Sequence, residues 1–401
     1  MNPKSIINLF SILVLFFSFS YLFPVVVSVI YDDGALHVFL KTLAILSATG
    51  VIGLIYTRNI KNDLSQKDGF VIIVMFWMIL SIAGSIPFYL SGLSFIDSFF
   101  ESMSGITTTG ATVIANIDNL PESILFYRQL LQWMGGMGLI VLAIAVMPLL
   151  GIGGGQIYKT EIPGAMGEQR LTPRIKETAQ ALWLIYLGLT IVCGILYYFA
   201  GMSAFDAIAH SMSTVAIGGF STHSDSIGFF NSLTIELICM IFMLLSAFSF
   251  TLHYFAVYKR KPLKYLYDPE FRFFLFMLTL VFLIALIIGL TSNNTQSPNI
   301  RQIVFHTVSM ISTTGFSISD TSDWPFSISF LLLIGAFVGA CSGSVGGGVK
   351  SWRLMIMLNH AYSNIMKIIH PSSVITLKIG TRSVDDQVAT SGWGVFSIYV
   401  I

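Results

Sequence analysis

The chain has 401 residues, of which 55% are hydrophobic and only 10% are charged, and its mean hydropathy is +0.80. A soluble protein has no interior large enough for that much apolar surface, so the composition excludes an ordinary soluble fold and predicts a membrane protein. The net charge of +1 is uninformative by itself, and we expect no nucleic-acid partner.

The distribution of the basic residues is more informative than their sum. Of the 21 Lys and Arg residues, only Lys41, Arg128 and Arg301 fall on one side of the predicted topology, which leaves 18 (21 minus 3) on the other. Loops rich in Lys and Arg stay in the cytoplasm. The sequence therefore predicts a cytoplasmic N-terminus.

The first 68 residues are predicted to form a hairpin of two spanning helices, at about 5–30 and 36–56. This hairpin is interpreted either as a docking element or as simple packing. The three cysteines lie within apolar segments, which indicates packing residues rather than disulfides; they are Cys193, Cys239 and Cys341.

Three repeats follow, each predicted to contain a long helix, a half-helix of about ten residues, a Thr/Gly-rich strip and a second long helix. The repeats occupy residues 69–158 (pore loop 95–112), 159–264 (a cytoplasmic loop, then pore loop 203–221) and 265–370 (pore loop 301–317). The second helix of the middle repeat is expected to run unbroken from about 229 to 258.

The strips align on one glycine each. Strip 1 (107–112) contains Gly110, strip 2 (216–221) contains Gly219 and strip 3 (312–317) contains Gly315. Six places before each glycine stands a serine, and nine places before it stand Glu101, His210 and His306 in turn. Ionisable groups within a membrane are functional candidates, but these three could equally brace the strips by hydrogen bonding.

A half-helix of about ten residues reaches only about half of a 30 Å hydrocarbon core. Its C-terminus carries partial negative charge, which favours a cation at the strip that follows. Glycine then allows successive carbonyl oxygens to turn towards an axis, as in potassium filters. The sequence therefore predicts a pore for a monovalent cation, built from repeats on one chain.

A glycine-rich loop (residues 339–350) interrupts the last long helix of the third repeat. Five glycines cannot sustain a helix there, so we predict a gating loop at 339–348, with a simple kink as the alternative. A phosphate-binding loop is rejected because Val349 precedes Lys350, where that motif requires glycine. Lys350 and Arg353 could set the charge beneath the gate or anchor the interface.

Charged side chains flank the strips and could attract cations to a pore mouth, or could belong to solvated loops; they are Asp118, His223, Asp225 and Asp320. Residues 371–401 are predicted to be the incomplete start of a fourth repeat, whose strip glycine is expected near position 430 by the 40-residue offset seen in the other repeats. A truncated chain that does not conduct is therefore an alternative function.

These motifs resemble the TrkH family of bacterial potassium-uptake subunits, within the TrkH/KtrB/HKT superfamily. The resemblance rests on Thr107-Thr-Thr-Gly-Ala-Thr112, on Thr214-Val-Ala-Ile-Gly-Gly-Phe-Ser221, on Ser312-Thr-Thr-Gly-Phe-Ser317, on the glycine-rich loop and on Leu171-Thr-Pro-Arg-Ile-Lys-Glu-Thr-Ala179. It implies an all-α polytopic fold around a pseudo-fourfold cation pore in the cytoplasmic (inner) membrane. It also implies a homodimer with a cytosolic TrkA-type subunit that carries the nucleotide sites.

The resemblance further implies which residues act. The filter residues would be Thr108, Thr109, Gly110, Ile217, Gly218, Gly219, Thr313, Thr314 and Gly315. The gate residues would be Gly339, Ser342, Gly343, Gly346, Gly347, Gly348 and Lys350. Potassium would be the transported ion and no organic cofactor is expected. We find no catalytic constellation and predict that the chain is not an enzyme; permeation of both Na+ and K+ is an alternative.

Overall fold

The structure of the chain is a computed structural model. The structure describes residues 3–58, 66–136, 138, 175–292, 297–370, 378–380, 382–383 and 386–400. The predicted cytoplasmic loop, and the first four residues of the 171–179 signature, lie outside the described residues. The described residues form two compact units: unit 1 comprises those within 1–161, 170–242 and 314–318, and unit 2 comprises those within 243–313 and 319–401.

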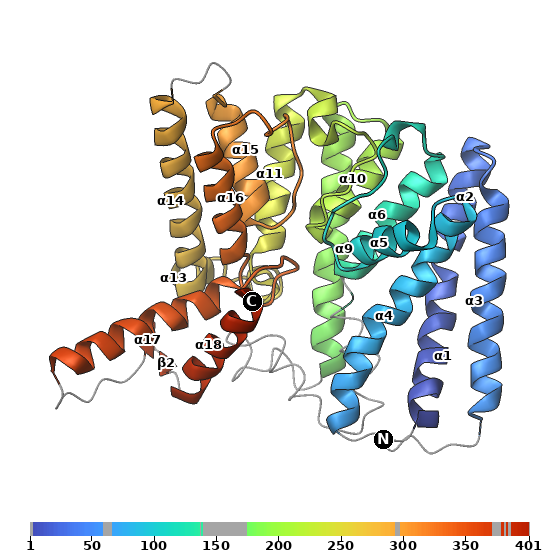
Figure 1. The fold of residues 1–401 in the computed structure, drawn as a ribbon, viewed down its shortest axis with the longest axis horizontal. Coiled ribbons are helices and arrows are strands. Elements are labelled where there is room, and N and C mark those ends of the chain that lie inside the picture. Colours follow the sequence, from blue (N-terminus) through green and yellow to red (C-terminus); the bar gives the residue numbers. More distant parts are fainter. Residues whose placement is uncertain are drawn as a thin grey trace. The chain divides into compact units, whose positions relative to one another are not determined.

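The described residues are almost entirely helical (Figure 1). Four of the described helices are long and apolar enough to cross a membrane, or five if one bent pair counts as a single span. The described β-structure is one antiparallel pair, β1 (Lys378–Ile379) with β2 (Arg382–Ser383). The prediction of an all-α polytopic membrane fold is confirmed.

Unit 1 begins with the predicted hairpin, in which α1 (Pro3–Phe19) and α3 (Leu36–Tyr56) lie side by side (Figure 1). Its centre is aromatic: the Tyr21 and Tyr127 hydroxyls are 3.0 Å apart, and Tyr127 donates to the Gly84 carbonyl. The helices of unit 1 are α1 (Pro3–Phe19), α2 (Leu22–Tyr31), α3 (Leu36–Tyr56), α4 (Gln66–Leu90), α5 (Phe95–Ile106), α6 (Glu122–Gly136), α9 (Ile175–Phe199) and α10 (Ala204–Ala216), with 3-10 turns at Ile117–Asn119 and Ser226–Phe230.

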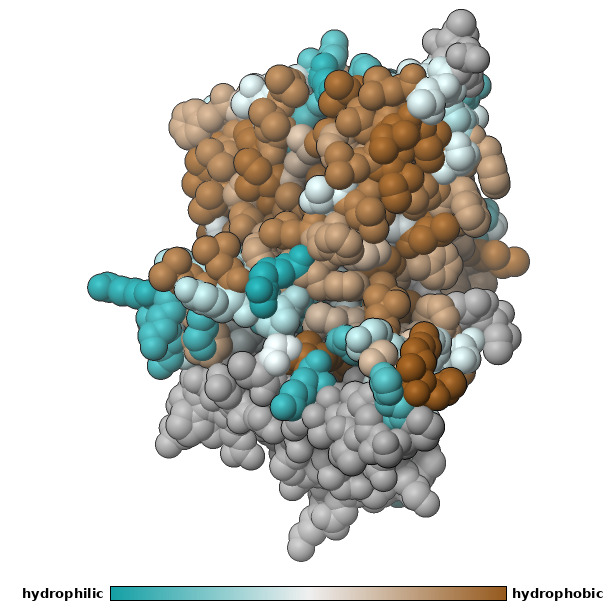
Figure 2. Space-filling model, turned by 90° about the vertical axis from the view of Figure 1, so that its left-hand side faces the viewer, coloured by the Kyte–Doolittle hydropathy of each residue, from teal (hydrophilic) through white to brown (hydrophobic). Residues whose placement is uncertain are grey.

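Unit 2 holds the later helices, and α11 (Leu233–Ala247) runs from the first unit into the second. The others are α12 (Phe250–Val257), α13 (Lys264–Tyr267), α14 (Pro269–Thr291), α15 (Ile300–Ile311), α16 (Phe326–Val338), α17 (Ser351–Ile369) and α18 (Asp386–Val400). Figure 2 shows a broad apolar area on this side of the molecule, with hydrophilic side chains above and below it. Phe276 and Ile287 on α14 and Phe330 on α16 are exposed apolar side chains, as expected of helices that face lipid.

The half-helices, predicted at residues 95–106, 203–215 and 301–311, correspond to α5, α10 and α15, and each end lies within one residue of the predicted one. Their starts are capped locally. Ser94 accepts the Asp97 amide, Ser203 accepts the Asp206 amide, and Asn299 forms a capping box with Gln302. These short helices therefore begin where the chain supplies a side-chain acceptor for their unpaired amides.

The prediction of one unbroken helix over 229–258 is wrong. The chain forms α11 and α12, which are bent by 98° at Phe248 and Ser249. The break frees backbone groups that an apolar environment cannot satisfy. Partners for them come from the glycine-rich loop: Phe250 donates to the Gly343 carbonyl, and the Ala247 carbonyl accepts from Cys341.

Candidate functional site

The three strips share one backbone conformation at equivalent positions. The glycine of each strip has a positive φ, of 79° at Gly110, 80° at Gly219 and 85° at Gly315. The residue two places earlier also has a positive φ, of 55° at Thr108, 55° at Ile217 and 66° at Thr313. Left-handed conformation at a β-branched residue costs about 1–3 kcal/mol and is found mainly at functional sites.

The strips are in close contact with one another. A Cβ on Gly110 would lie 2.2 Å from the Gly218 carbonyl oxygen, and one on Gly219 would lie 2.1 Å from the Thr314 carbonyl oxygen. Strip 1 therefore meets strip 2, and strip 2 meets the part of strip 3 that belongs to unit 1. In both contacts a strip glycine faces the carbonyl just before the glycine of the next strip. Side chains larger than hydrogen are excluded at these two positions.

The half-helices of unit 1 end directly at their strips. The Thr109 amide donates to the Ser104 carbonyl at 2.8 Å, and the Gly218 amide donates to the Ser213 carbonyl at 2.9 Å. These are the same two positions in the two repeats. The negative ends of α5 and α10 are thus tied to strips 1 and 2 by one recurring bond.

The bracing interpretation of Glu101 and His210 is confirmed by their contacts. Glu101 accepts from the Thr112 hydroxyl at 3.0 and 3.1 Å and from the Val113 amide at 3.2 Å. His210 Nε2 lies 2.9 Å from the Ser221 hydroxyl. In both repeats, the half-helix residue nine places before the strip glycine binds the residue two places after it.

His306 occupies the equivalent position in the third repeat but binds differently. Its Nε2 atom lies 3.4 Å from the Ser319 hydroxyl, and its ring contacts Trp324 edge-on. The brace therefore reaches the residue four places after Gly315 rather than two. The three repeats share the backbone conformation of the strip, but the third differs in the partner of its bracing side chain.

The glycine-rich loop is held at several points within unit 2. The Gly347 amide donates to the Thr313 hydroxyl of strip 3 at 2.7 Å. The Glu270 carboxylate accepts from the Ser342 amide at 2.5 Å and from the Trp352 amide at 3.1 Å. The Lys350 ammonium group donates to the Gly346 carbonyl. Where the helix is interrupted, these hydrogen bonds hold the loop in a defined position.

Most of the chain matches one known protein family. A family model for TrkH, described as a cation transport protein, matches residues 35–401. The chain belongs to the TrkH family of cation transport proteins. The resemblance drawn from the strips and the glycine-rich loop is confirmed.

Individual members of the TrkH family are similar to the entire chain. The Trk system potassium uptake protein TrkH of Halomonas elongata is 48% identical over 405 residues, covering 100% of this chain and 84% of its own length. TrkG of Escherichia coli is 39% identical, covering 100% of this chain and 83% of its own. The crystal structure of the potassium transporter TrkH from Vibrio parahaemolyticus superposes with a TM-score of 0.89 at 44% identity, covering 100% of this chain and 84% of that one.

Sequence reasoning on this TrkH-family chain missed Arg128 as a site residue. Arg128 on α6 is fully buried and donates from Nε to Glu101 at 2.7 Å. It also donates from Nη1 to the Ser221 carbonyl at 3.0 Å and stacks over the Phe220 ring. A buried arginine thus joins the brace of strip 1 to the end of strip 2. The sequence feature that could have indicated Arg128 is a charged residue within an apolar helix.

Gln132 was missed as well. It lies four residues after Arg128 on α6, so both side chains project from the same face of the helix. Gln132 is buried and its amide donates to the Gly218 carbonyl at 2.7 Å. One helix therefore supplies two polar side chains behind the strips.

His223, in the loop after strip 2, lies between two carboxylates. Its Nδ1 atom is 3.4 Å from Asp118, and its Nε2 atom is 3.2 Å from Asp206. Burial opposes the charge on His223, but the two carboxylates outweigh it and raise the pKa of the imidazole. The predicted mouth residues Asp118 and His223 are thus brought together, whereas Asp320 bonds locally to the Ser322 amide.

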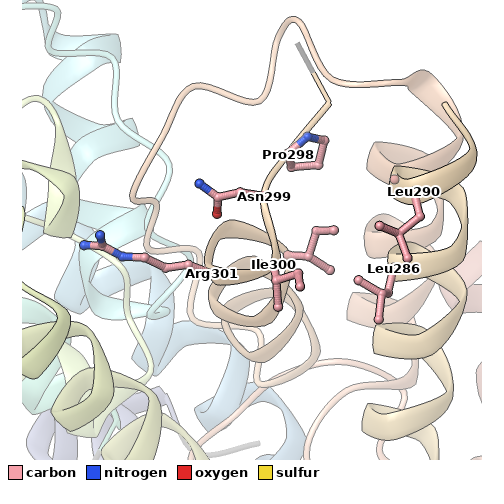
Figure 3. Close-up of a pocket in the computed structure, with 8 residues that line it drawn as sticks. Leu286, Leu290, Pro298, Asn299, Ile300 and Arg301 are labelled. Carbon is pink, nitrogen blue, oxygen red and sulfur yellow. The ribbon is translucent and has the colours of Figure 1, made fainter. Parts of the chain in front are cut away.

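An open groove of about 480 Å³ lies between α14 and the start of α15. Figure 3 shows Leu286 and Leu290 on one wall and Ile300 on the other, with Arg301 pointing away from them. No strip residue lines this groove. Among the described residues, no group of three or more His, Cys, Asp and Glu side chains could hold a metal ion.

Proposed function

We propose that this chain is the membrane subunit of a Trk-type potassium-uptake system and that K+ crosses the membrane between the strips. The observation that carries the proposal is the repeated pair of left-handed residues in each strip, with strips 1 and 2 and strips 2 and 3 in contact. In the proposed pore, the carbonyl oxygens of the strips face a shared axis and replace the hydration shell of the ion. Relatives named as potassium uptake proteins support K+ as the substrate.

The proposed filter consists of residues 108–110, 217–219 and 313–315, which act through their carbonyl groups. The proposed gate is the glycine-rich loop, because its Gly347 amide is bonded to Thr313 of strip 3. Flux would then require the loop to move. The repeat boundaries predicted above remain part of this proposal.

The proposal is tested by rubidium and sodium uptake into vesicles that contain the full chain. We expect rubidium to enter faster than sodium, and Gly110→Ser to reduce that preference because its side chain would strike the Gly218 carbonyl. Gly188→Ala on α9 is the control, since a Cβ there meets no described atom within 4 Å. Equal entry of both ions would favour relaxed selectivity, and no uptake by folded wild-type chain would contradict the conduction proposal.

The assembly and orientation are also proposed. We propose a homodimer in the cytoplasmic membrane with a cytoplasmic N-terminus, bound to a TrkA-type nucleotide-binding subunit. The excess of Lys and Arg in the loops on the N-terminal side supports the orientation. Purification from native membranes should recover such a subunit with the chain; its consistent absence under mild detergent would contradict the partner proposal.

A further inference from the structure

The middle repeat departs from the other two at one filter position. The residue just before the strip glycine is Thr109 in strip 1 and Thr314 in strip 3, but Gly218 in strip 2. Gly218 does not have the positive φ of its two neighbours in the strip. Backbone conformation therefore does not explain why this position lacks a side chain.

Packing explains it. A Cβ on Gly218 would lie 2.3 Å from Cδ, 2.4 Å from Oε1 and 2.8 Å from Nε2 of Gln132. The whole amide group of Gln132 thus lies flat against Gly218, in the space that a threonine side chain would occupy. A side chain from α6 takes the place of the one that strip 2 lacks.

Gln132 uses both ends of its amide on strip 2 and its half-helix. Nε2 donates to the Gly218 carbonyl at 2.7 Å, and Oε1 accepts from the Ser213 hydroxyl at 2.7 Å and from the Phe220 amide at 3.1 Å. The side chain is fully buried. Three bonds fix the position of this amide, and the amide in turn fixes the direction of the Gly218 carbonyl.

We infer that Gln132 and Gly218 form a matched pair that sets the ion preference of strip 2, with Gln132 as a positioning residue outside the filter. The inference rests on the proposed function. A carbonyl oxygen can accept two bonds, so the Gly218 carbonyl can bind Gln132 and still face an ion. The orientation of the Gly218 carbonyl and its partial negative charge then depend on Gln132. The electrostatic field that an ion meets at strip 2 therefore differs from the field beside Thr109 and Thr314.

The first experiment uses Gln132→Leu, which keeps most of the volume but removes all three hydrogen bonds. We expect the ratio of rubidium to sodium uptake to fall by about tenfold, the effect of losing one buried bond to the carbonyl. Thr42→Val is the matched control, because the buried Thr42 hydroxyl bonds to Val38 within its own helix. An unchanged ratio in a folded Gln132→Leu protein would overturn the inference.

The second experiment tests the pairing itself. Gly218→Thr alone should clash with Gln132 and lower both folded yield and selectivity. Gln132→Ala should lower selectivity, and the double variant Gln132→Ala/Gly218→Thr should recover much of both, because threonine then fills the space that the shortened side chain leaves. A double variant no better than the worse single variant would overturn the pairing, even if neither single variant folds.

These outcomes remain distinguishable from failure of the proposed function. If the wild-type chain shows no preference for rubidium over sodium, the filter proposal fails, and recovery of folded yield in the double variant still tests the pair. If the wild-type chain discriminates and Gln132→Leu discriminates equally well, only this inference fails. The ratio of rubidium to sodium uptake shows whether Gln132 acts as a positioning residue. A merely structural role would change the folded yield without changing this ratio.

Discussion

The Gly347 amide donates a hydrogen bond of 2.7 Å to the hydroxyl of Thr313. The two residues are 34 positions apart, and the bond joins the glycine-rich loop to strip 3 within unit 2. This bond is the contact on which the proposed gating role of the loop rests. The bond also gives the proposed gate a specific contact that can be removed.

Thr313→Val should raise basal rubidium uptake severalfold, because valine has nearly the shape of threonine but cannot accept the Gly347 amide. A neutral hydrogen bond contributes about 0.5–1.5 kcal/mol, which corresponds to about a 2- to 12-fold shift between closed and open loop. Thr313→Ser keeps the hydroxyl and is the control. Equal basal uptake in both variants would contradict a gating role for this bond.

Glu270→Leu should weaken a second attachment of the glycine-rich loop. The Glu270 carboxylate accepts amides from Ser342 within the loop and from Trp352 just after it, and leucine would leave both buried amides without an acceptor. We expect faster proteolysis within the loop and higher basal uptake. Glu270→Gln keeps an accepting oxygen and should stay close to wild type; a Gln variant as damaged as the Leu variant would show that charge, not acceptance, matters.

Arg128→Met should be strongly destabilising, by about 3–5 kcal/mol, because it leaves the buried Glu101 carboxylate without its cation. The ion pair has a separation of 2.7 Å and both side chains are inaccessible to solvent. The double variant Arg128→Met/Glu101→Gln should recover part of the loss, since no buried charge then remains. Thermal unfolding in detergent measures both, and additive losses in the double variant would contradict the pairing.

The cluster of His223 with Asp118 and Asp206 should make stability depend on pH. The pKa of His223 is raised in the folded protein, so its stabilising contribution is complete below its unfolded pKa and is lost as pH rises through the folded value. We expect the wild-type melting temperature to fall from pH 5.5 to pH 8.5 more than that of His223→Gln. The difference should correspond to about 1 kcal/mol or less, because Asp118 is half exposed. Parallel pH profiles of the two proteins would argue against this cluster.

Local sequence was sufficient for the half-helices and for the strips. Ser94 and Ser203 start α5 and α10 by capping them, and the glycines 110, 219 and 315 permit the positive φ that follows. Each of these features depends on residues within about ten positions of one another. The break at Gly339 was also predictable, because a cluster of glycines destabilises any helix locally.

The bend between α11 and α12 was not predictable from the same rules. The segment around Phe248 and Ser249 is apolar, with no proline and no glycine, so its own propensity favours a continuous helix. The bend exists because the glycine-rich loop supplies partners for the Ser246 and Ala247 carbonyls and for the Phe250 amide. The glycine-rich loop, which is distant in the sequence, thus determines the backbone conformation between α11 and α12.

The amino-acid sequence is sufficient to predict a membrane protein of repeated helix, half-helix and strip units, because apolar length, caps and glycines act over short distances. Which strips touch, and which side chains lie behind them, depends on how the helices pack. Arg128 meets Ser221 across 93 residues, and Gln132 meets Gly218 across 86. Contacts over such separations arise from the packing of α6 against α5 and α10, and no local pattern in the chain encodes them.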